Sequence, residues 1–317
     1  MEAASATQQQ SGDGGGLSRK WIGIIVGVTL LIAFIGLLAA FGSEGQNHEY
    51  QPQNEFELLP WIEIQIGGLD LSINKAVLYL FIASTLTTAT MIYVAKRMED
   101  KPNLVQTAVE AAYDLTNNNI TRNNIDRSDM AAKWFPFIAT LFLFILFNNL
   151  IGYIPLPTAT EHKFNLFGLA IPSFALYAAT ANISVPMVLT LIVWVGYHVE
   201  GVRTHGVKGY FATWVPSGVE GAARVPIFII EVISHFVRLI SLSVRLFANI
   251  LAGHLLILFM GGGLAVLLGL AAAGVLTVPV AIVFFLFEIG LISTLQAFIF
   301  ATLTAIYLGG ATAAEGH

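Results

Sequence analysis

The ionisable residues best placed for chemistry lie in one long apolar stretch, residues 225–260. Glu231, Arg238 and Arg245 recur every seven residues. Seven residues of α-helix turn by about 700°, so the three side chains are predicted to follow almost one line. An arginine at the bilayer centre costs about 2.5–3.5 kcal/mol on insertion scales, and it keeps its proton. Two such arginines therefore predict water, a carboxylate partner or a functional role in this helix.

Other polar side chains accompany this line. Three of them flank it, and two belong to the next apolar run, residues 279–308: Ser234, Ser241, Asn249, Glu288 and Gln296. His254 lies nine residues beyond Arg245, about 180° around the helix, so it is predicted to face the opposite way. The 36 residues of 225–260 would measure about 54 Å, whereas the hydrocarbon core is about 30 Å thick. The helix must therefore tilt by about 55°, break or run partly along the membrane.

The composition predicts a polytopic membrane protein. The chain has 317 residues, of which 56% are hydrophobic and 11% are charged, and its mean hydropathy is +0.74. The absence of cysteine excludes disulfides, thiol catalysis and cysteine-ligated metals. The 15 lysines and arginines do not cluster, so no nucleic-acid partner is expected. The histidines do not occur in pairs with the spacing that a di-haem cytochrome needs. No set of residues suited to metal-dependent or nucleophilic catalysis is seen in the sequence. We therefore expect neither a cofactor nor a catalytic site.

The predicted fold is all-α, with about six membrane helices and one amphipathic interfacial helix at 103–120. The membrane helices are expected at 21–41, 76–95, 134–151, 182–199, 225–260 and 279–308. The last two should form a long, strongly tilted hairpin inside the membrane. Between them, glycines at 261–263 break the first helix, and the small-residue segment 264–277 is expected to be a turn or a re-entrant piece.

The N-terminal third is predicted to divide into three parts. Residues 1–20 are expected to be a disordered tail, and 42–75 an acidic external loop that has no Lys or Arg before Lys75. Residues 21–41 form a retained transmembrane helix or, alternatively, a cleaved signal segment. Residues 76–317 form the membrane domain, with its core at 225–308. If 21–41 is retained, both termini are expected on the cytoplasmic side of a bacterial plasma membrane.

Two motifs give the chain a family resemblance. The run SVRLFANILAGHLL at 243–256 and the run STLQAFIFATLTAIYL at 293–308 together resemble subunit a of the F-type rotary ATP synthase. The resemblance extends through IIEVISHFVRLISLSVRLFAN and the FNNLIGYIP turn at 147–155, and covers most of 76–308. It implies a stator that lies against a ring of c subunits, is joined by b-type peripheral stalk subunits, and conducts protons through two offset half-channels.

The resemblance also implies roles for individual residues. Arg245 matches the essential arginine that faces the rotor, and Asn249 matches its polar neighbour. The cytoplasmic half-channel positions correspond to Glu231, Ser234, Arg238 and Ser241. The outer half-channel positions correspond to His254, Glu288, Gln296 and Asn149.

Three features depart from the family pattern. Glu288 lies eight residues before Gln296 instead of seven, which predicts either a local bulge or a changed role. His254 stands where some members carry an acid, with the partner position exchanged. Gly152 replaces an acid that some members carry after the Asn149 turn.

Other interpretations stay open at this point. Arg245 could have a purely structural role as an ion-pair partner of Glu288. Asn149 could likewise only cap the end of a helix. Two rival classes are a secondary transporter, which usually shows inverted repeats, and a membrane-bound enzyme, which needs a catalytic constellation. The sequence shows neither feature.

Overall fold

The computed structural model describes residues 27–29, 58, 60–67, 69–70, 72–97, 99–154, 164–166, 169–171, 178–216, 218–219, 221–260 and 271–313. Within these residues, five helices are long and apolar enough to cross a membrane. They confirm the predicted all-α polytopic fold. The predicted tail 1–20 and most of the predicted helix 21–41 lie outside the described residues.

The first described helices run from one membrane helix into the interfacial segment. α2 (Lys75–Lys96) begins at Asn74, whose side chain accepts a hydrogen bond from the Val77 amide at 3.1 Å. α3 (Leu104–Asp114) is capped in the same way by Asn103. It continues through a π-helical segment, η2 (Leu115–Thr121), into the short α4 (Arg122–Asn124). The interfacial helix predicted at 103–120 is therefore present and longer than expected.

Both central helices end later than predicted, and the first of them also begins earlier. α5 spans Ser128–Gly152 and α6 spans Ser184–Thr213, after the short 3-10 helix η3 (Ala179–Ala181). Lys133 of α5 and Glu200 of α6 form an ion pair at 2.5 Å. α6 bends at Gly206, whose φ of 71° and ψ of 165° are not helical. The chain after Gly206 folds back, and a Cβ at Gly201 would collide with the Tyr210 ring.

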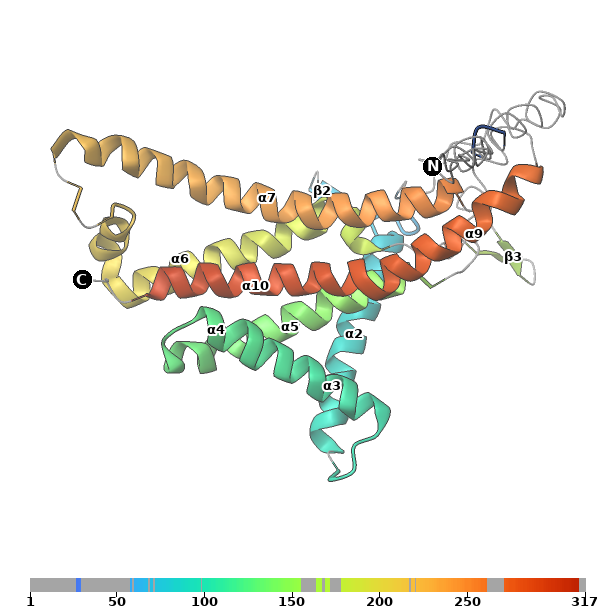
Figure 1. Ribbon diagram of the computed structural model, residues 1–317, viewed down its shortest axis with the longest axis horizontal. Helices are drawn as coiled ribbons and strands as arrows, with labels where there is room; N and C mark the ends of the chain where they lie inside the picture. Colours follow the sequence, from blue (N-terminus) through green and yellow to red (C-terminus); the bar gives the residue numbers. More distant parts are fainter. Residues whose placement is uncertain are drawn as a thin grey trace, which may run out of the picture.

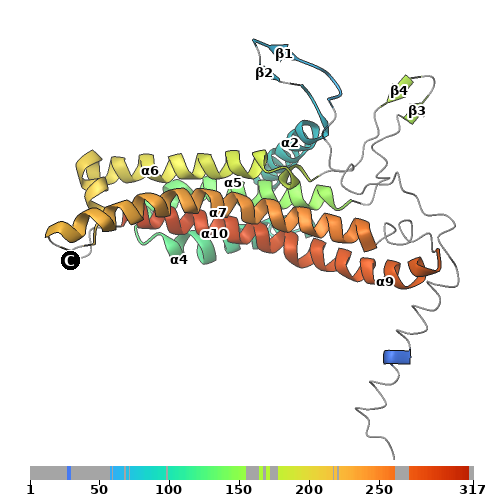
Figure 2. The ribbon, with the colours of Figure 1, turned by 90° about the horizontal axis from the view of Figure 1, so that it is seen from above.

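The two long helices form the predicted hairpin (Figures 1 and 2). The 3-10 helix η4 (Gly221–Ala223) precedes α7, which spans Arg224–Leu258. The return helix consists of α9 (Ala271–Phe287), the π-helical segment η6 (Glu288–Ile292) and α10 (Ser293–Thr312). The 35 residues of α7 measure about 52 Å, far more than the hydrocarbon thickness. The segment 264–277 was expected to be a turn or a re-entrant piece. A turn is wrong for residues 271–277, which are helical because the apolar small-residue run extends α9.

α10 is the centre of the bundle, because it packs against α5, α6 and α7. Ala297, Ala301 and Ala305 are fully buried on one side of α10. Small residues at this spacing let neighbouring helices approach closely in a membrane. The strands form only two short antiparallel hairpins, β1 (Gln65–Ile66) with β2 (Leu69–Asp70) and β3 (Phe164–Leu166) with β4 (Leu169–Ile171). Both hairpins extend away from the helices (Figure 2).

Candidate functional site

Arg245 lies on the exposed face of α7. Ser241 and Asn249, one turn before and after it, are exposed on the same side, whereas Leu246 and Ile250 are buried on the other. Among the described residues, Arg245 forms no ion pair and no side-chain hydrogen bond. It borders an open hollow of about 400 Å³ whose other lining residues are Val237, Ile240, Ser241 and Val244. A permanent cation is therefore presented outward from an apolar helix.

A second group of polar residues lies towards the start of α7 and consists of Glu231, His235 and Arg238. Together with the neighbouring Tyr197 and Tyr307, we call this group the Glu231 cluster. Arg238 Nη2 donates to Glu231 Oε1 at 3.0 Å, and the Nε2 atom of His235 lies 3.6 Å from the same oxygen. The Arg238 guanidinium lies 5.5 Å from the centroid of the Tyr307 ring. Glu231 and Arg238, the first two residues of the predicted line, are therefore on the same side of α7, and their charges neutralise each other.

A cavity of about 340 Å³ adjoins the Glu231 cluster. Its walls come from α6, α7 and α10 and include Tyr197, Trp214 and Tyr307. The Tyr197 hydroxyl is 2.9 Å from His235 Nδ1. His198 of α6 packs against the Trp194 and Trp214 rings. Its environment depends on the fold-back after Gly206, which sequence patterns do not reveal.

Ser234 is half-buried on α7, one turn after Glu231. Ser241 does not share this environment, because it is exposed beside Arg245. The structure thus divides the four residues predicted for one half-channel. Glu231 and Arg238 lie at the cavity, Ser234 lies next to them in the helix, and Ser241 belongs to the outward Arg245 face.

Glu288 is at the centre of a third group, formed where α5, α7 and the return helix meet. The Tyr153 hydroxyl donates to Glu288 Oε2 at 2.9 Å. Gly253 of α7 lies directly against this carboxylate, since a Cβ there would be 2.5 Å from the Glu288 carboxyl carbon. We call Asn149, Tyr153, His254 and Glu288 the Glu288 cluster. No ion pair joins Glu288 to Arg245, although the structure describes both residues.

His254 enters the Glu288 cluster through Tyr153. Its ring centroid lies 4.4 Å from that of Tyr153. Its Nε2 atom is 3.0 Å from the Gly152 carbonyl oxygen, and its Nδ1 atom is 2.9 Å from the Ile250 carbonyl oxygen. A neutral imidazole has one N–H, so only the protonated ring can donate to both carbonyls. Gain or loss of one proton therefore changes how His254 is held.

Asn149 ties α5 to the return helix. Its Nδ2 atom donates to the Ser293 carbonyl oxygen at 3.3 Å, and its Oδ1 atom accepts from the Thr180 hydroxyl at 2.8 Å. These contacts are between helices, so the helix-cap interpretation of Asn149 is wrong. Gln296 is also buried, three residues after Ser293 on α10. Gly152 has no room for a larger side chain, because a Cβ there would collide with Ala178.

The unusual spacing of Glu288 and Gln296 has a local cause. The π-helical segment η6 begins at Glu288 and ends at Ile292. A π turn contains one more residue than an α-helical turn. The π turn therefore absorbs the one residue by which the Glu288–Gln296 separation exceeds the seven residues of the family pattern. The predicted bulge is confirmed, and Glu288 faces the Tyr153 and Gly253 positions as a result.

The structure therefore brings the predicted residues into three separate places: the Arg245 face, the Glu231 cluster and the Glu288 cluster. Sequence reasoning missed Tyr153, Tyr307 and Gly253, which contact Glu288 or Arg238. Tyr153 and Tyr307 belong to the GYIP and IYL ends of the motifs, and Gly253 precedes His254. Their position inside the motifs was the available signal.

The comparisons with known proteins agree on one family. The family model described as ATP synthase A chain matches residues 77–309. Subunit a of the ATP synthase of Rubrobacter xylanophilus is 35% identical over 260 residues, which is 80% of this chain and 90% of the relative. The subunits a of Mesorhizobium japonicum and Hyphomonas neptunium are 34% and 31% identical, over 82% and 84% of this chain and 95% and 97% of their own. Since the matched region contains all three groups of polar residues, the chain that carries them belongs to the ATP synthase A chain family.

Proposed function

We propose that this chain is the stator proton-channel subunit of an ATP synthase, with Arg245 facing a rotating ring of c subunits. The observation that carries the proposal is the state of Arg245. It is exposed on an apolar helix with no acidic partner in the described part of the chain, whereas Arg238 is paired with Glu231. An unpaired cation at membrane depth is costly and calls for a partner. A carboxylate on the passing c subunit is the partner that fits.

Arg245 then has two effects on the rotor. Its charge lowers the proton affinity of the facing carboxylate, so that the carboxylate releases its proton as it arrives. Because a guanidinium does not lose its proton, Arg245 itself cannot pass protons directly between the two sides. Protons must therefore travel with the ring, which couples proton flow to rotation and ATP synthesis.

Two wet paths would serve the ring. The Glu231 cluster and its cavity are proposed to be the cytoplasmic half-channel, with Ser234 and Arg238 along it and Ser241 on the Arg245 face where the path would reach the ring. The Glu288 cluster is proposed to be the outer half-channel, with Gln296 beside it. Support comes from their position, because the two clusters lie on either side of Arg245 along α7, 14 and nine residues away at Glu231 and His254.

The partners and location follow the same proposal. Besides the c ring, b-type peripheral stalk subunits would hold the chain against rotation. The membrane would be a bacterial plasma membrane, with both termini on the cytoplasmic side if the helix at 21–41 is retained. Five membrane-spanning helices within the described residues agree with a multi-pass chain.

Single cysteines test the two paths directly, since the chain has no native cysteine. Ser234→Cys reports on the Glu231 cluster, and Leu255→Cys reports on the Glu288 cluster from the turn beside His254. In the intact complex in oriented vesicles, we expect a membrane-impermeant thiol reagent to modify the first from the cytoplasmic side and the second from the other side. Val283→Cys, on a 67% exposed apolar position of α9, is the control and should resist the polar reagent.

Modification of both Ser234→Cys and Leu255→Cys from one side would contradict the assignment of two half-channels. Protection of Ser234→Cys from the cytoplasmic side would remove the Glu231 cluster from the path. Reactivity of Val283→Cys with the polar reagent would show that the reagent does not discriminate wet from apolar positions.

A further inference from the structure

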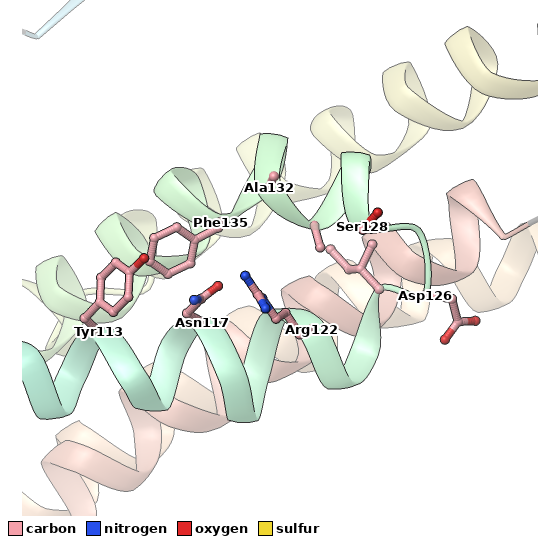
Figure 3. A pocket seen from close by; sticks show the side chains of 9 residues that line it. Tyr113, Asn117, Arg122, Asp126, Ser128, Ala132 and Phe135 are labelled. Carbon is pink, nitrogen blue, oxygen red and sulfur yellow. The ribbon is translucent and has the colours of Figure 1, made fainter.

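A cavity of about 380 Å³ lies between the interfacial segment and the start of α5, away from all three groups of polar residues. We call it the interfacial pocket. Its polar and charged lining residues are Asn117, Arg122, Asp126 and Ser128. Its apolar lining includes Tyr113, Ala132 and Phe135 (Figure 3). The proposed half-channels do not use any of these residues.

Arg122 supplies an available positive charge in the interfacial pocket. The guanidinium and the Asn117 side chain point into the space between the two helices (Figure 3). The carboxylate of Asp126 points away from that space (Figure 3), and no ion pair joins it to Arg122. The neighbouring Arg127 differs, because it is paired with Asp129 at 2.8 Å. Arg122 forms no ion pair or side-chain hydrogen bond among the residues that the structure describes.

The π-helical segment η2 creates this arrangement. In an α-helix, residues five apart point about 140° away from each other. In η2 the Arg122 amide bonds to the Asn117 carbonyl, as a π turn requires, so the two residues stack on one side. π turns of this kind are frequent at functional sites. The result is a planar, five-donor guanidinium beside a side-chain amide, a combination suited to phosphate oxygens.

The depth of the pocket points to a lipid. The 25 residues of α5 measure about 37 Å, so its ends extend beyond a hydrocarbon core of about 30 Å. Ser128, the first residue of α5, therefore lies at headgroup level. Towards the apolar side, Tyr113 and Phe135 pack edge to face with centroids 4.9 Å apart, and both line the pocket. A phosphate site beside an aromatic wall matches a molecule with a charged head and an acyl chain.

We propose that the interfacial pocket binds an anionic phospholipid, with its phosphate on Arg122 and Asn117 and an acyl chain along Phe135. Basic pockets beside membrane helices are known to take such headgroups. The site has a structural consequence, because the same segment supports the end of α10. A Cβ at Gly309 would collide with the Asn124 carbonyl oxygen, so α10 and α4 are in direct contact. A lipid bound at Arg122 would hold this segment against α10.

The test uses the intact complex in nanodiscs of phosphatidylcholine doped with phosphatidylglycerol, with native mass spectrometry as the readout of bound phosphatidylglycerol. Arg122→Gln should weaken phosphatidylglycerol binding by about tenfold to a hundredfold, the range for charge-assisted hydrogen bonds. The matched control is Arg127→Gln, which removes an equal charge at the same depth. It should weaken binding by no more than about fivefold.

Two further arms separate the pocket and the lipid from simpler explanations. Ala132→Phe fills the pocket but keeps Arg122, and it should weaken binding at least as much as Arg122→Gln. Arg122→Lys keeps the charge and the fold but lacks the planar fork, and should weaken binding less than Arg122→Gln. Soluble glycerol phosphate, which lacks acyl chains, should not displace phosphatidylglycerol.

Equal losses in Arg122→Gln and Arg127→Gln would overturn the proposal in favour of unspecific surface charge. Full binding in Ala132→Phe would place the lipid elsewhere and overturn it too. Displacement by glycerol phosphate would identify the ligand as a free phosphate compound instead of a lipid. A loss in both Arg122→Lys and Arg122→Gln that accompanies loss of the assembled complex would assign Arg122 to folding, which also contradicts the proposal.

Discussion

The Glu231 cluster and the Glu288 cluster both keep a carboxylate inside an apolar helix bundle, but they do so by different means. Glu231 has a permanent cation at 3.0 Å and an adjoining cavity of about 340 Å³. Glu288 is held by a tyrosine hydroxyl at 2.9 Å and is covered by the bare Cα of Gly253. No cation forms an ion pair with Glu288 among the described residues.

The difference matters because an ion pair and a neutral hydrogen bond respond differently to a proton. A carboxylate beside an arginine has a fixed opposite charge as its partner. A buried carboxylate bonded only to a hydroxyl can exist with or without a proton, at a cost that depends on its surroundings. Under the proposed function, the Glu288 cluster would be a place where a proton can bind. The residues of the Glu231 cluster instead line one side of the cavity described above.

Arg245 separates the two clusters, and its removal should have the largest effect. Arg245→Ala should abolish ATP-driven proton pumping in vesicles while the complex still assembles, because the other arginine on this line of α7, Arg238, is paired with Glu231 and cannot replace it. Arg245→Lys should fail as well, since an ammonium lacks the planar fork and loses its proton more readily when desolvated. Normal pumping by Arg245→Ala would break the comparison, because the two clusters would then need no barrier between them.

Gly253 tests whether close packing defines the Glu288 cluster. A Cβ at this position would lie 2.5 Å from the carboxyl carbon, so Gly253→Ala must displace Glu288. Overpacking of about 1–3 kcal/mol corresponds to a pumping rate lower by about fivefold to a hundredfold. The control is Gly290→Ala, which lies in the π-helical segment η6 together with Glu288. An added Cβ at Gly290 would meet no atom within 4 Å. Equal effects of the two substitutions would show that helix propensity, and not contact with Glu288, is responsible.

Tyr153→Phe removes only the hydroxyl that bonds to Glu288. A hydrogen bond of about 0.5–1.5 kcal/mol corresponds to a loss of about twofold to tenfold in pumping rate. Tyr93→Phe is the control, because its exposed hydroxyl only accepts a long hydrogen bond of 3.5 Å from Asn103. Unchanged pumping by Tyr153→Phe would mean that the hydroxyl does not contribute to transport through the Glu288 cluster.

Arg238 should have the smallest effect of the four. Its ion pair with Glu231 is about one-third exposed on both sides, and such pairs contribute about 0–1 kcal/mol. We expect Arg238→Gln to pump within about fivefold of the parent complex, and Glu231→Gln combined with Arg238→Gln to be no worse. If Arg238→Gln were as inactive as Arg245→Ala, the Glu231 cluster would hold an essential charge and its contrast with the Glu288 cluster would disappear.

The long helices and the placement of Arg245 on the family motif were predictable, because both depend on patterns within one stretch of chain. Apolar runs specify membrane helices through their length alone, and the seven-residue spacing of Glu231, Arg238 and Arg245 specifies a common line. The half-turn offset of His254 follows from the same geometry. Each of these properties needs only the helical repeat and the hydrophobic thickness of a bilayer.

The tertiary structure alone decided which polar groups meet. Tyr153 and Glu288 are 135 residues apart in the chain, and their hydrogen bond depends on how α5 packs against the return helix. The chain folds back after Gly206 and brings Trp214 to the cavity beside Glu231. The hydrophobic periodicity of the sequence does not predict this fold-back. The π turn at Glu288 was signalled by the sequence only as an irregular spacing. Hydropathy and helical repeat act locally, whereas these contacts require the relative positions of whole helices, which packing determines.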